Sequence, residues 1–115
     1  VRAKYENRSE FIRDLIREHL VEDEWERDGK VVGTVTVLFS HHQAGLQAEL
    51  TEVQHHHHDL ILATSHVHLD HDHCLEVIMV KGKASKLRDM TAEIKCRKGV
   101  LHAVLSMTAP GDKLS

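Results

Sequence analysis

The chain has 115 residues, a formal net charge of −3 and an apolar content of 41%, values typical of one soluble globular domain and not of a disordered chain. No apolar run approaches the roughly 20 residues that a membrane-spanning helix needs, and no signal-peptide pattern opens the sequence. We therefore expect a cytoplasmic protein with no membrane partner. The negative charge argues against a broadly basic surface for nucleic acids, but it does not exclude a local one.

The N-terminal segment predicts a helix over residues 7 to about 25. A capping-box pattern at Asn7 and Glu10 opens it. Apolar side chains then recur at helical spacing, at Phe11, Ile12, Leu15, Ile16 and Leu20. Turn-forming Asp and Gly residues end the segment, so we place a domain boundary after residue 28.

Residues 29–115 alternate between strand and helix patterns. Strands are expected where β-branched and apolar residues run together, and helices where apolar residues recur at i, i+4 and i+7. The expected elements are a strand over 31–39, a helix over about 43–55, strands over 60–69 and 75–80, a helix after Gly82, and a strand over 101–107. This order predicts an α+β, ferredoxin-like βαββαβ domain with both helices on one face of an antiparallel sheet. The other face must be covered, and in a small domain a second subunit commonly covers it.

Histidine is unusually abundant, with twelve in the chain and eight of them between residues 55 and 73. His66 and His68 sit at i and i+2, so they project from the same face of the expected strand. If the connection to the next strand spans residues 69–73, Cys74 lies opposite His68. Two imidazoles and a thiolate then converge, a ligand set that suits zinc, copper(II) or nickel(II) and rejects magnesium and calcium.

The alternative interpretation is a pair of partly exposed strand histidines beside an inert buried cysteine, and His-x-His alone would favour it. The adjacent run of four histidines at residues 55–58 favours a metal site instead. An affinity tag usually stands at a terminus and carries six histidines, whereas this run is internal, so we interpret it as native and expect at least one ligand in it. The second cysteine, Cys96, is expected to be structural.

Three stretches together resemble the metal-binding core of the nickel-responsive ribbon-helix-helix repressors. They are Gln54-His55-His56-His57-His58-Asp59-Leu60, the pair His66-Val67-His68, and Cys74-Leu75-Glu76. Asn7-Arg8-Ser9-Glu10, followed by Ile12-Arg13-Asp14, resembles the second helix of the family's DNA-binding domain. The resemblance covers nearly the whole chain. It implies that residues 1–28 are the last part of a ribbon-helix-helix domain and that residues 29–115 form an ACT-like nickel-binding and tetramerisation domain.

The same resemblance implies that nickel(II) is held in square-planar geometry by His66, His68 and Cys74 of one subunit and His55 of another. It implies a homotetramer whose central sheets carry the nickel sites and whose DNA-binding dimers flank them. Nickel binding in this family controls the binding of operator DNA and represses nickel-uptake genes, with no enzymatic activity and no small-molecule substrate. Spacing alone does not separate nickel from copper.

Spacing does suggest why the fourth ligand comes from a second subunit. His55 and His66 are 11 residues apart, and most of that interval is read as extended strand. One chain would then hold them about 25–35 Å apart, beyond the reach of one ion.

The resemblance is incomplete in two places. The family reads DNA with a strand that precedes two helices, and the sequence contains neither that strand nor the first helix. We therefore expect a fragment that binds nickel and oligomerises but does not recognise a specific operator. Gln43 and Ala44 stand where the family can carry basic residues that contact phosphates.

Two auxiliary cation sites are also candidates. Glu10 and Asp14, at i and i+4, share a helix face. Spacing alone favours a solvated face there, whereas the resemblance implies potassium or a second metal ion at the junction of the two domains. His41 is a candidate for a weaker auxiliary ion.

Two other function classes compete with a metalloregulator. A histidine-rich metal chaperone or storage protein would have many weak sites and no DNA-binding helix, and the helix pattern after Asn7 argues against it. A metal-dependent hydrolase needs an open coordination position and a nearby general base. Glu76 is the only close carboxylate on the strand, and it is better suited to support a ligand.

Overall fold

The computed structural model describes residues 9, 11–16 and 28–108. Residues 11–16 are helical, as predicted, and the rest of the helix expected over residues 7–25 lies outside the described residues, apart from residue 9. The other elements, in chain order, are β1 (Lys30–Ser40), α2 (Leu46–His56), the short 3-10 helix η2 (His58–Leu60), β2 (Ile61–His68), β3 (His73–Lys83), α3 (Ala84–Lys95) and β4 (Val100–Thr108). The predicted order β-α-β-β-α-β is confirmed, with boundaries shifted by a few residues at most.

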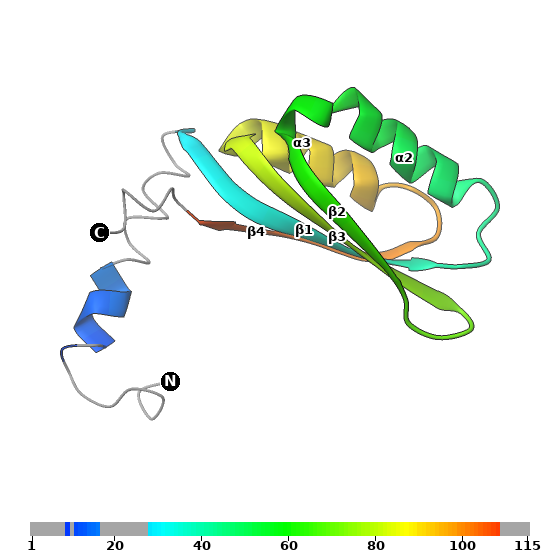
Figure 1. Ribbon diagram of the computed structural model, residues 1–115, viewed down its shortest axis with the longest axis horizontal. Helices are drawn as coiled ribbons and strands as arrows, with labels where there is room; N and C mark the ends of the chain where they lie inside the picture. Colours follow the sequence, from blue (N-terminus) through cyan, green and yellow to red (C-terminus); the bar gives the residue numbers. More distant parts are fainter. Residues whose placement is uncertain (1–8, 10, 17–27, 109–115) are drawn as a thin grey trace.

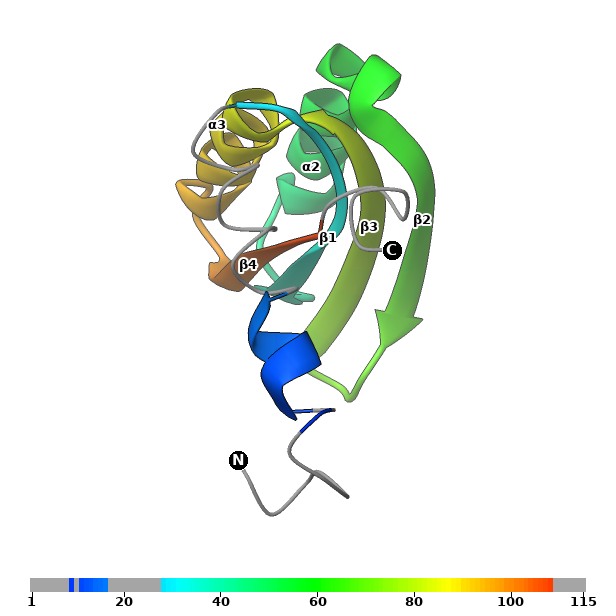
Figure 2. The same ribbon diagram turned by 90° about the vertical axis from the view of Figure 1, so that its left-hand side faces the viewer.

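The four strands form one sheet in the order β2-β3-β1-β4, and every neighbouring pair is antiparallel. Both helices lie on one face of this sheet (Figure 1 and Figure 2), which confirms the predicted ferredoxin-like arrangement. The connection through α2 carries the chain from β1 past β3 to β2, and the connection through α3 carries it from β3 past β1 to β4. β2 is therefore an edge strand, and it presents the His-x-His pair at an accessible border of the sheet.

The core lies between the sheet and the two helices. Each helix turns one apolar face toward the sheet because its apolar residues recur every three or four positions. These residues are Leu46, Leu50 and Val53 in α2, and Leu87, Met90 and Ile94 in α3. They pack over the buried β1 residues Val31, Val35, Val37 and Phe39. In the described part of the chain, no helix is long and apolar enough to cross a membrane.

Two glycines are required by the backbone. Gly99 follows α3 with a φ of 96°, a conformation that favours glycine after a helix. A Cβ at this position would lie 2.6 Å from the Cγ atom of Gln43, so the absence of a side chain lets the β1–α2 and α3–β4 connections pack closely. Gly33 in β1 serves a similar purpose, because a Cβ there would overlap the backbone oxygen of Ser106 in β4.

The start of the domain is tied to α3. Asp28 accepts hydrogen bonds from the backbone N–H and the hydroxyl of Ser85, at 2.7 and 2.8 Å. The Ala84 N–H donates to the Gly29 carbonyl at 3.3 Å. These contacts satisfy donors in the first turn of α3. They also lower the pKa of the Asp28 carboxyl, chiefly through the Ser85 N–H.

The sheet face away from the helices is apolar. β3 buries every second residue toward the helices, so Leu75, Val77 and Met79 lie on the opposite face. Val67 pairs with Leu75 on this face, and Val104 of β4 pairs there with β1. Val67, Met79 and Val104 expose 49%, 37% and 40% of their surface. A row of exposed large apolar side chains is typical of a surface that another protein chain covers.

Candidate metal centre

The β2–β3 hairpin sets the register of the predicted ligands. His68 pairs with Cys74 and His66 pairs with Glu76, so the five-residue connection brings the thiol opposite His68, as predicted. Residues directly opposite each other on antiparallel strands share a face. Here that face is covered by the helices, since Cys74 and Glu76 are both buried. Paired strands therefore carry both halves of the motif.

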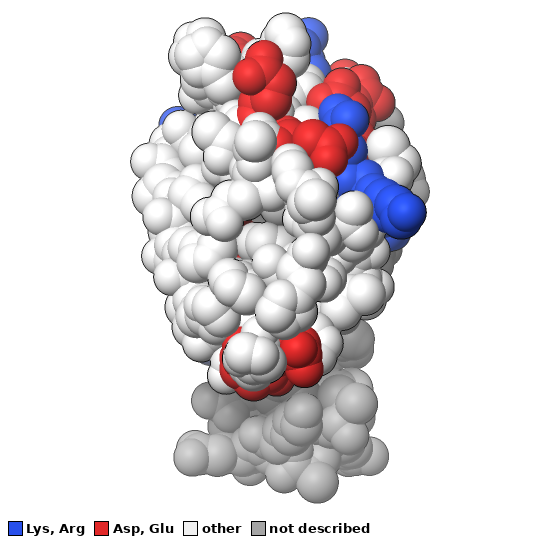
Figure 3. Space-filling view, turned by 90° about the vertical axis from the view of Figure 1, so that its right-hand side faces the viewer, with Lys and Arg blue, Asp and Glu red and all other residues white. Residues whose placement is uncertain are grey.

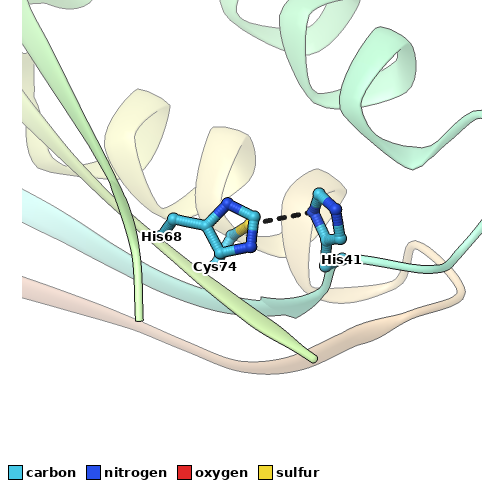
Figure 4. A group of neighbouring side chains, drawn as sticks. All are labelled: His41, His68 and Cys74. Carbon is cyan, nitrogen blue, oxygen red and sulfur yellow. Dashed lines mark hydrogen bonds between the residues drawn. The ribbon is translucent and has the colours of Figure 1, made fainter. Parts of the chain in front are cut away.

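A third residue, His41, completes a compact group with His68 and Cys74 (Figure 4). One ring nitrogen from each histidine and the sulfur all lie within 4.8 Å of one another. The Cys74 Sγ and the His41 Nδ1 are 3.5 Å apart, and the His41 and His68 ring centroids are 4.3 Å apart. His41 reaches this place because Ser40, the last residue of β1, pairs with His73. We call this group the thiol cluster.

The thiol cluster has the chemistry of a site for a transition metal. Cys74 is 1% exposed and both histidines are exposed, so the sulfur forms the floor and the imidazoles form the rim. Desolvation lowers the pKa of His41, and the neighbouring His68 ring lowers it further. The neutral imidazole that binds metal is thereby favoured. Two imidazoles and a thiolate fit nickel, copper or zinc and do not fit magnesium.

His66 lies on the same strand face two residues away, outside the thiol cluster. Its Nδ1 is 3.3 Å from the Oε2 atom of Glu76, and its ring stands edge-on to Phe39 with centroids 5.8 Å apart. Glu76 is 7% exposed and presents a largely desolvated carboxylate. A hydrogen bond at Nδ1 leaves Nε2 as the ligand atom of this ring.

Glu76 belongs to a hydrogen-bonded chain of side chains that we call the Gln54 network. The Thr64 hydroxyl donates to Oε1 of Gln54 at 3.1 Å. The Nε2 of Gln54 donates to Oε1 of Glu76, and the other Glu76 oxygen faces His66. The network joins α2, β2 and β3. Sequence reasoning identified Glu76 as a support for a ligand, but it assigned no such part to Gln54 or Thr64, because their partners come from other elements.

A second group, which we call the turn cluster, comprises His42, His71 and Asp72, with ligand atoms within 4.8 Å of one another. The His42 Nε2 is 3.1 Å from an Asp72 oxygen, and the His42 and His71 ring centroids are 5.4 Å apart. All three side chains are exposed and lie in connections between elements. From the sequence, residues 69–73 are expected only as the connection between two strands, although the alternation of His with Asp in this segment is a signal for a second group of ligands.

Both clusters lie at the end of the molecule formed by the hairpin and the β1–α2 connection. Figure 3 views this end: the middle of the view carries neither Lys nor Arg, Asp and Glu side chains lie toward the top and bottom, and Lys and Arg side chains lie toward the upper right. A cation approaching the clusters therefore meets no positive side chain across that middle region.

Asp70 holds the hairpin turn between the two clusters. Its carboxylate accepts hydrogen bonds from the backbone N–H groups of Asp72 and His73, each at 2.9 Å, and lies 2.9 Å from the His73 ring. These bonds lower the pKa of Asp70, chiefly through the Asp72 N–H. The bonds close the turn from which Cys74 follows in register with β2.

His55 lies near the end of α2 with its side chain exposed. Its ring centroid is 6.3 Å from that of His58, and it belongs to neither cluster. The expected separation of about 25–35 Å from His66 is wrong, because only residues 61–66 of the interval are extended. α2 continues to His56, η2 follows, and β2 then returns along the sheet beneath α2 (Figure 1). The hydrogen bond from Gln54 to Glu76 brings this end of α2 over the strand pair that carries His66.

The other candidate residues that the structure describes belong to neither cluster. Asp14 is half-buried in the helical segment, and Glu10, its expected partner for a cation, lies outside the described residues. Cys96 is an exposed free thiol at the C-cap of α3. Gln43 is half-buried and Ala44 is exposed.

The chain is similar to known proteins over most of its length. Residues 32–108 match the model of the family described as the NikR C terminal nickel binding domain. A relative from Nitratidesulfovibrio vulgaris (strain DSM 19637 / Miyazaki F) is 46% identical over 112 residues, covering 96% of this chain and 81% of that protein. A relative from Desulfotalea psychrophila is 46% identical over 110 residues with the same coverage. One from Methanocaldococcus jannaschii is 41% identical over 112 residues, covering 96% and 79%. All three are assigned by name to the nickel-responsive regulators.

Proposed function

The chain belongs to the family of nickel-responsive regulators. We propose that it binds nickel(II) across a subunit interface, and that nickel binding controls the binding of operator DNA and so represses nickel-uptake genes. As a member of this family it is a regulator and not an enzyme. The observation that carries the proposal is the pairing of His68 with Cys74 on the hairpin. This pairing brings a thiol and an imidazole together on adjacent strands, and such ligands favour a borderline transition-metal ion over magnesium or calcium.

The ligands that we propose are His66, His68 and Cys74 of one subunit and His55 of the partner subunit. His66 is suited to this role because Glu76 accepts at its Nδ1, which orients the ring and leaves Nε2 as the ligand atom. His55 is suited to serve a neighbour because it is exposed at the end of α2. We expect this ligand set to hold nickel in a planar four-coordinate arrangement. The thiolate would then give a charge-transfer band in the absorption spectrum.

Three weaker sites belong to the proposal. His41 takes an auxiliary ion together with His42, because the centroids of the two rings lie 5.3 Å apart. The turn cluster is a second place for such an ion. Glu10 and Asp14 hold potassium or a second metal at the junction of residues 1–28, the end of a ribbon-helix-helix domain, with residues 29–115, the nickel-binding and tetramerisation domain.

The assembly that we propose is a homotetramer. Its support is the apolar sheet face around Leu75, Val77 and Met79, which no described element covers. Closure around a two-fold axis makes each exchange of His55 reciprocal, so a subunit pair holds two equivalent nickel sites. In the full-length protein, nickel then selects among arrangements of the DNA-binding dimers in the cytoplasm, and operator DNA and nickel strengthen each other's binding.

A second candidate is a metal store, and the exposed turn cluster is the observation that favours it. The two functions differ in stoichiometry, since a store binds several ions per chain with similar affinity. A regulator binds one tightly and any others weakly.

The test is a nickel titration followed by absorption spectroscopy. We expect one tight equivalent per chain, with a thiolate charge-transfer band and a planar four-coordinate spectrum. A tetrahedral spectrum, or several equivalents of equal affinity, contradicts the proposal.

A further inference from the structure

We propose that the Gln54 network couples the two nickel sites of a subunit pair, so that filling one site raises the affinity of the other. The inference rests on the proposed function, because it needs His55 of each subunit to serve the partner. It goes further by naming the residues that carry the coupling. The starting observation is that Gln54, which contacts the Glu76–His66 pair, stands directly before His55 in the sequence.

The first step is the orientation of the Gln54 side chain. Its carbonyl end accepts from the Thr64 hydroxyl and its amide end donates to Glu76. Both ends are engaged, and an amide turned by 180° would place its carbonyl oxygen against the Glu76 carboxylate, where neither group can donate. The side chain is half-buried, which strengthens the preference for one orientation.

The second step links Glu76 to the metal. The Glu76 carboxylate is 7% exposed and accepts from Gln54 with one oxygen while the other faces the His66 Nδ1 at 3.3 Å. A metal ion at Nε2 makes the Nδ1–H a stronger donor. Metal binding therefore tightens the bond to Glu76 and, through the shared carboxylate, favours the position in which Gln54 is held.

The third step links Gln54 to the other site. α2 ends at His56, so Gln54 and His55 both belong to its last turn, where helices fray most readily. Fixing Gln54 restricts the backbone that carries His55. The subunit whose own site is filled therefore presents a better-ordered His55 to its partner, which lowers the ordering cost of filling the second site.

The expected coupling is at the low end of the usual range for coupled sites, because one hydrogen-bonded chain carries it. We expect the second nickel ion of a pair to bind about 3- to 10-fold more tightly than the first. For two identical sites this coupling gives a Hill coefficient of about 1.3 to 1.5.

The test compares nickel titrations of the assembled protein with those of Gln54→Leu and Gln47→Leu. Gln47 is an exposed residue of the same helix and serves as the matched control. We expect a Hill coefficient above 1 for the unaltered chain and for Gln47→Leu, and a value of 1 for Gln54→Leu, with the charge-transfer band retained in all three. A Hill coefficient of 1 for the unaltered chain, or cooperativity that survives in Gln54→Leu, overturns the inference.

Two additions keep the test decisive. If Gln54→Leu does not fold, Thr64→Val removes one bond of the network from an exposed strand position and should give an intermediate Hill coefficient. Nitrogen NMR of the metal-free protein should find the His66 proton on Nδ1 in the unaltered chain and a mixture of tautomers in Gln54→Leu. An identical tautomer in both contradicts the second step. Absence of tight nickel binding in the unaltered chain is a different result, because it refutes the proposed function itself.

Discussion

The thiol cluster and the turn cluster contain similar side chains, but different parts of the fold carry those side chains. Cys74 and His68 are held by a strand pair with one register, and Cys74 is 1% exposed. His42, His71 and Asp72 lie in connections and are exposed throughout. A ligand on a paired strand loses little conformational entropy when metal binds, whereas a ligand in a loop must be ordered first. Metal-ligand residue types therefore do not define a strong site by themselves.

The largest expected effect comes from removing the thiol. Cys74→Ala should weaken nickel binding by at least about 100-fold, because a thiolate is the ligand that selects this class of metal ion, and the charge-transfer band should vanish. Cys96→Ala is the matched control, since this thiol is exposed and lies outside both clusters. Competition with a chelator measures both. Equal losses in the two variants would refute the assignment of Cys74.

The next prediction tests whether tight nickel binding depends on subunit assembly while weak binding at the turn cluster does not. Val104→Glu introduces a charge on the apolar sheet face and should raise the dissociation constant of the assembly by at least about tenfold, since an unpaired charge is costly to bury. Tight nickel binding should fall with it, because His55 of the partner subunit is lost. Weak binding at the turn cluster should persist.

The measurement is sedimentation velocity combined with a nickel titration. Lys86→Glu, on an exposed position of α3, is the control and should leave both properties unchanged. A monomeric Val104→Glu protein that keeps tight nickel binding argues against a shared site.

A smaller effect is expected at the turn cluster. His71→Ala should remove about one weak nickel equivalent, changing its affinity several-fold, and leave the tight equivalent intact, because exposed loop ligands bind without a rigid frame. Equilibrium dialysis at high nickel concentration counts the equivalents. His102→Ala, an exposed histidine of β4 outside both clusters, is the control. Loss of the tight equivalent in His71→Ala would show that the two clusters act as one site.

The smallest effect on nickel affinity is expected from a substitution of Asp28, which belongs to neither cluster and serves as a reference. The bonds from Ser85 lower the pKa of Asp28 in the folded chain, so its ionised form stabilises the fold above about pH 4, the unfolded value. That contribution is lost as the pH falls through the lowered folded pKa. Asp28→Ala should therefore lower Tm at pH 7, and the difference from the unaltered chain should disappear toward pH 2.

Thermal unfolding across this pH range, with Asp89→Ala on the exposed face of α3 as the control, measures the effect. Nickel affinity at pH 7 should be the same in Asp28→Ala and the unaltered chain. A difference in Tm that stays constant down to pH 2 would mean that Asp28 does not act through its charge.

Much of the fold followed from the sequence, because its signals are local. The alternation of β1 and the spacing of Leu87, Met90 and Ile94 in α3 each identify an element without reference to the others. The hairpin register was predictable for the same reason, since the length of one connection decides whether Cys74 faces His68.

The parts of the site that escaped prediction depend on contacts between distant elements. His41 lies beside the Cys74 thiol because β1 pairs with β3, and no local sequence pattern predicts this contact. Gln54 reaches Glu76 only because α2 lies over β2 and β3. The separation of His55 and His66 depends on such contacts as well: residues 61–66 form a strand, as the sequence predicts, but the end of α2 and η2 reverse the chain before it and shorten the distance.

The central claim is that one nickel site draws ligands from two subunits, and complementation tests it most directly. His55→Ala and Cys74→Ala should each abolish tight nickel binding. When the two are mixed under conditions that exchange subunits, a mixed pair combines an intact Cys74 with His55 of the partner subunit, and its second site carries both defects. About a quarter of the original tight capacity should return, because half of the pairs are mixed and each regains one of two sites. If subunits demonstrably exchange and no tight binding returns, the shared site is contradicted.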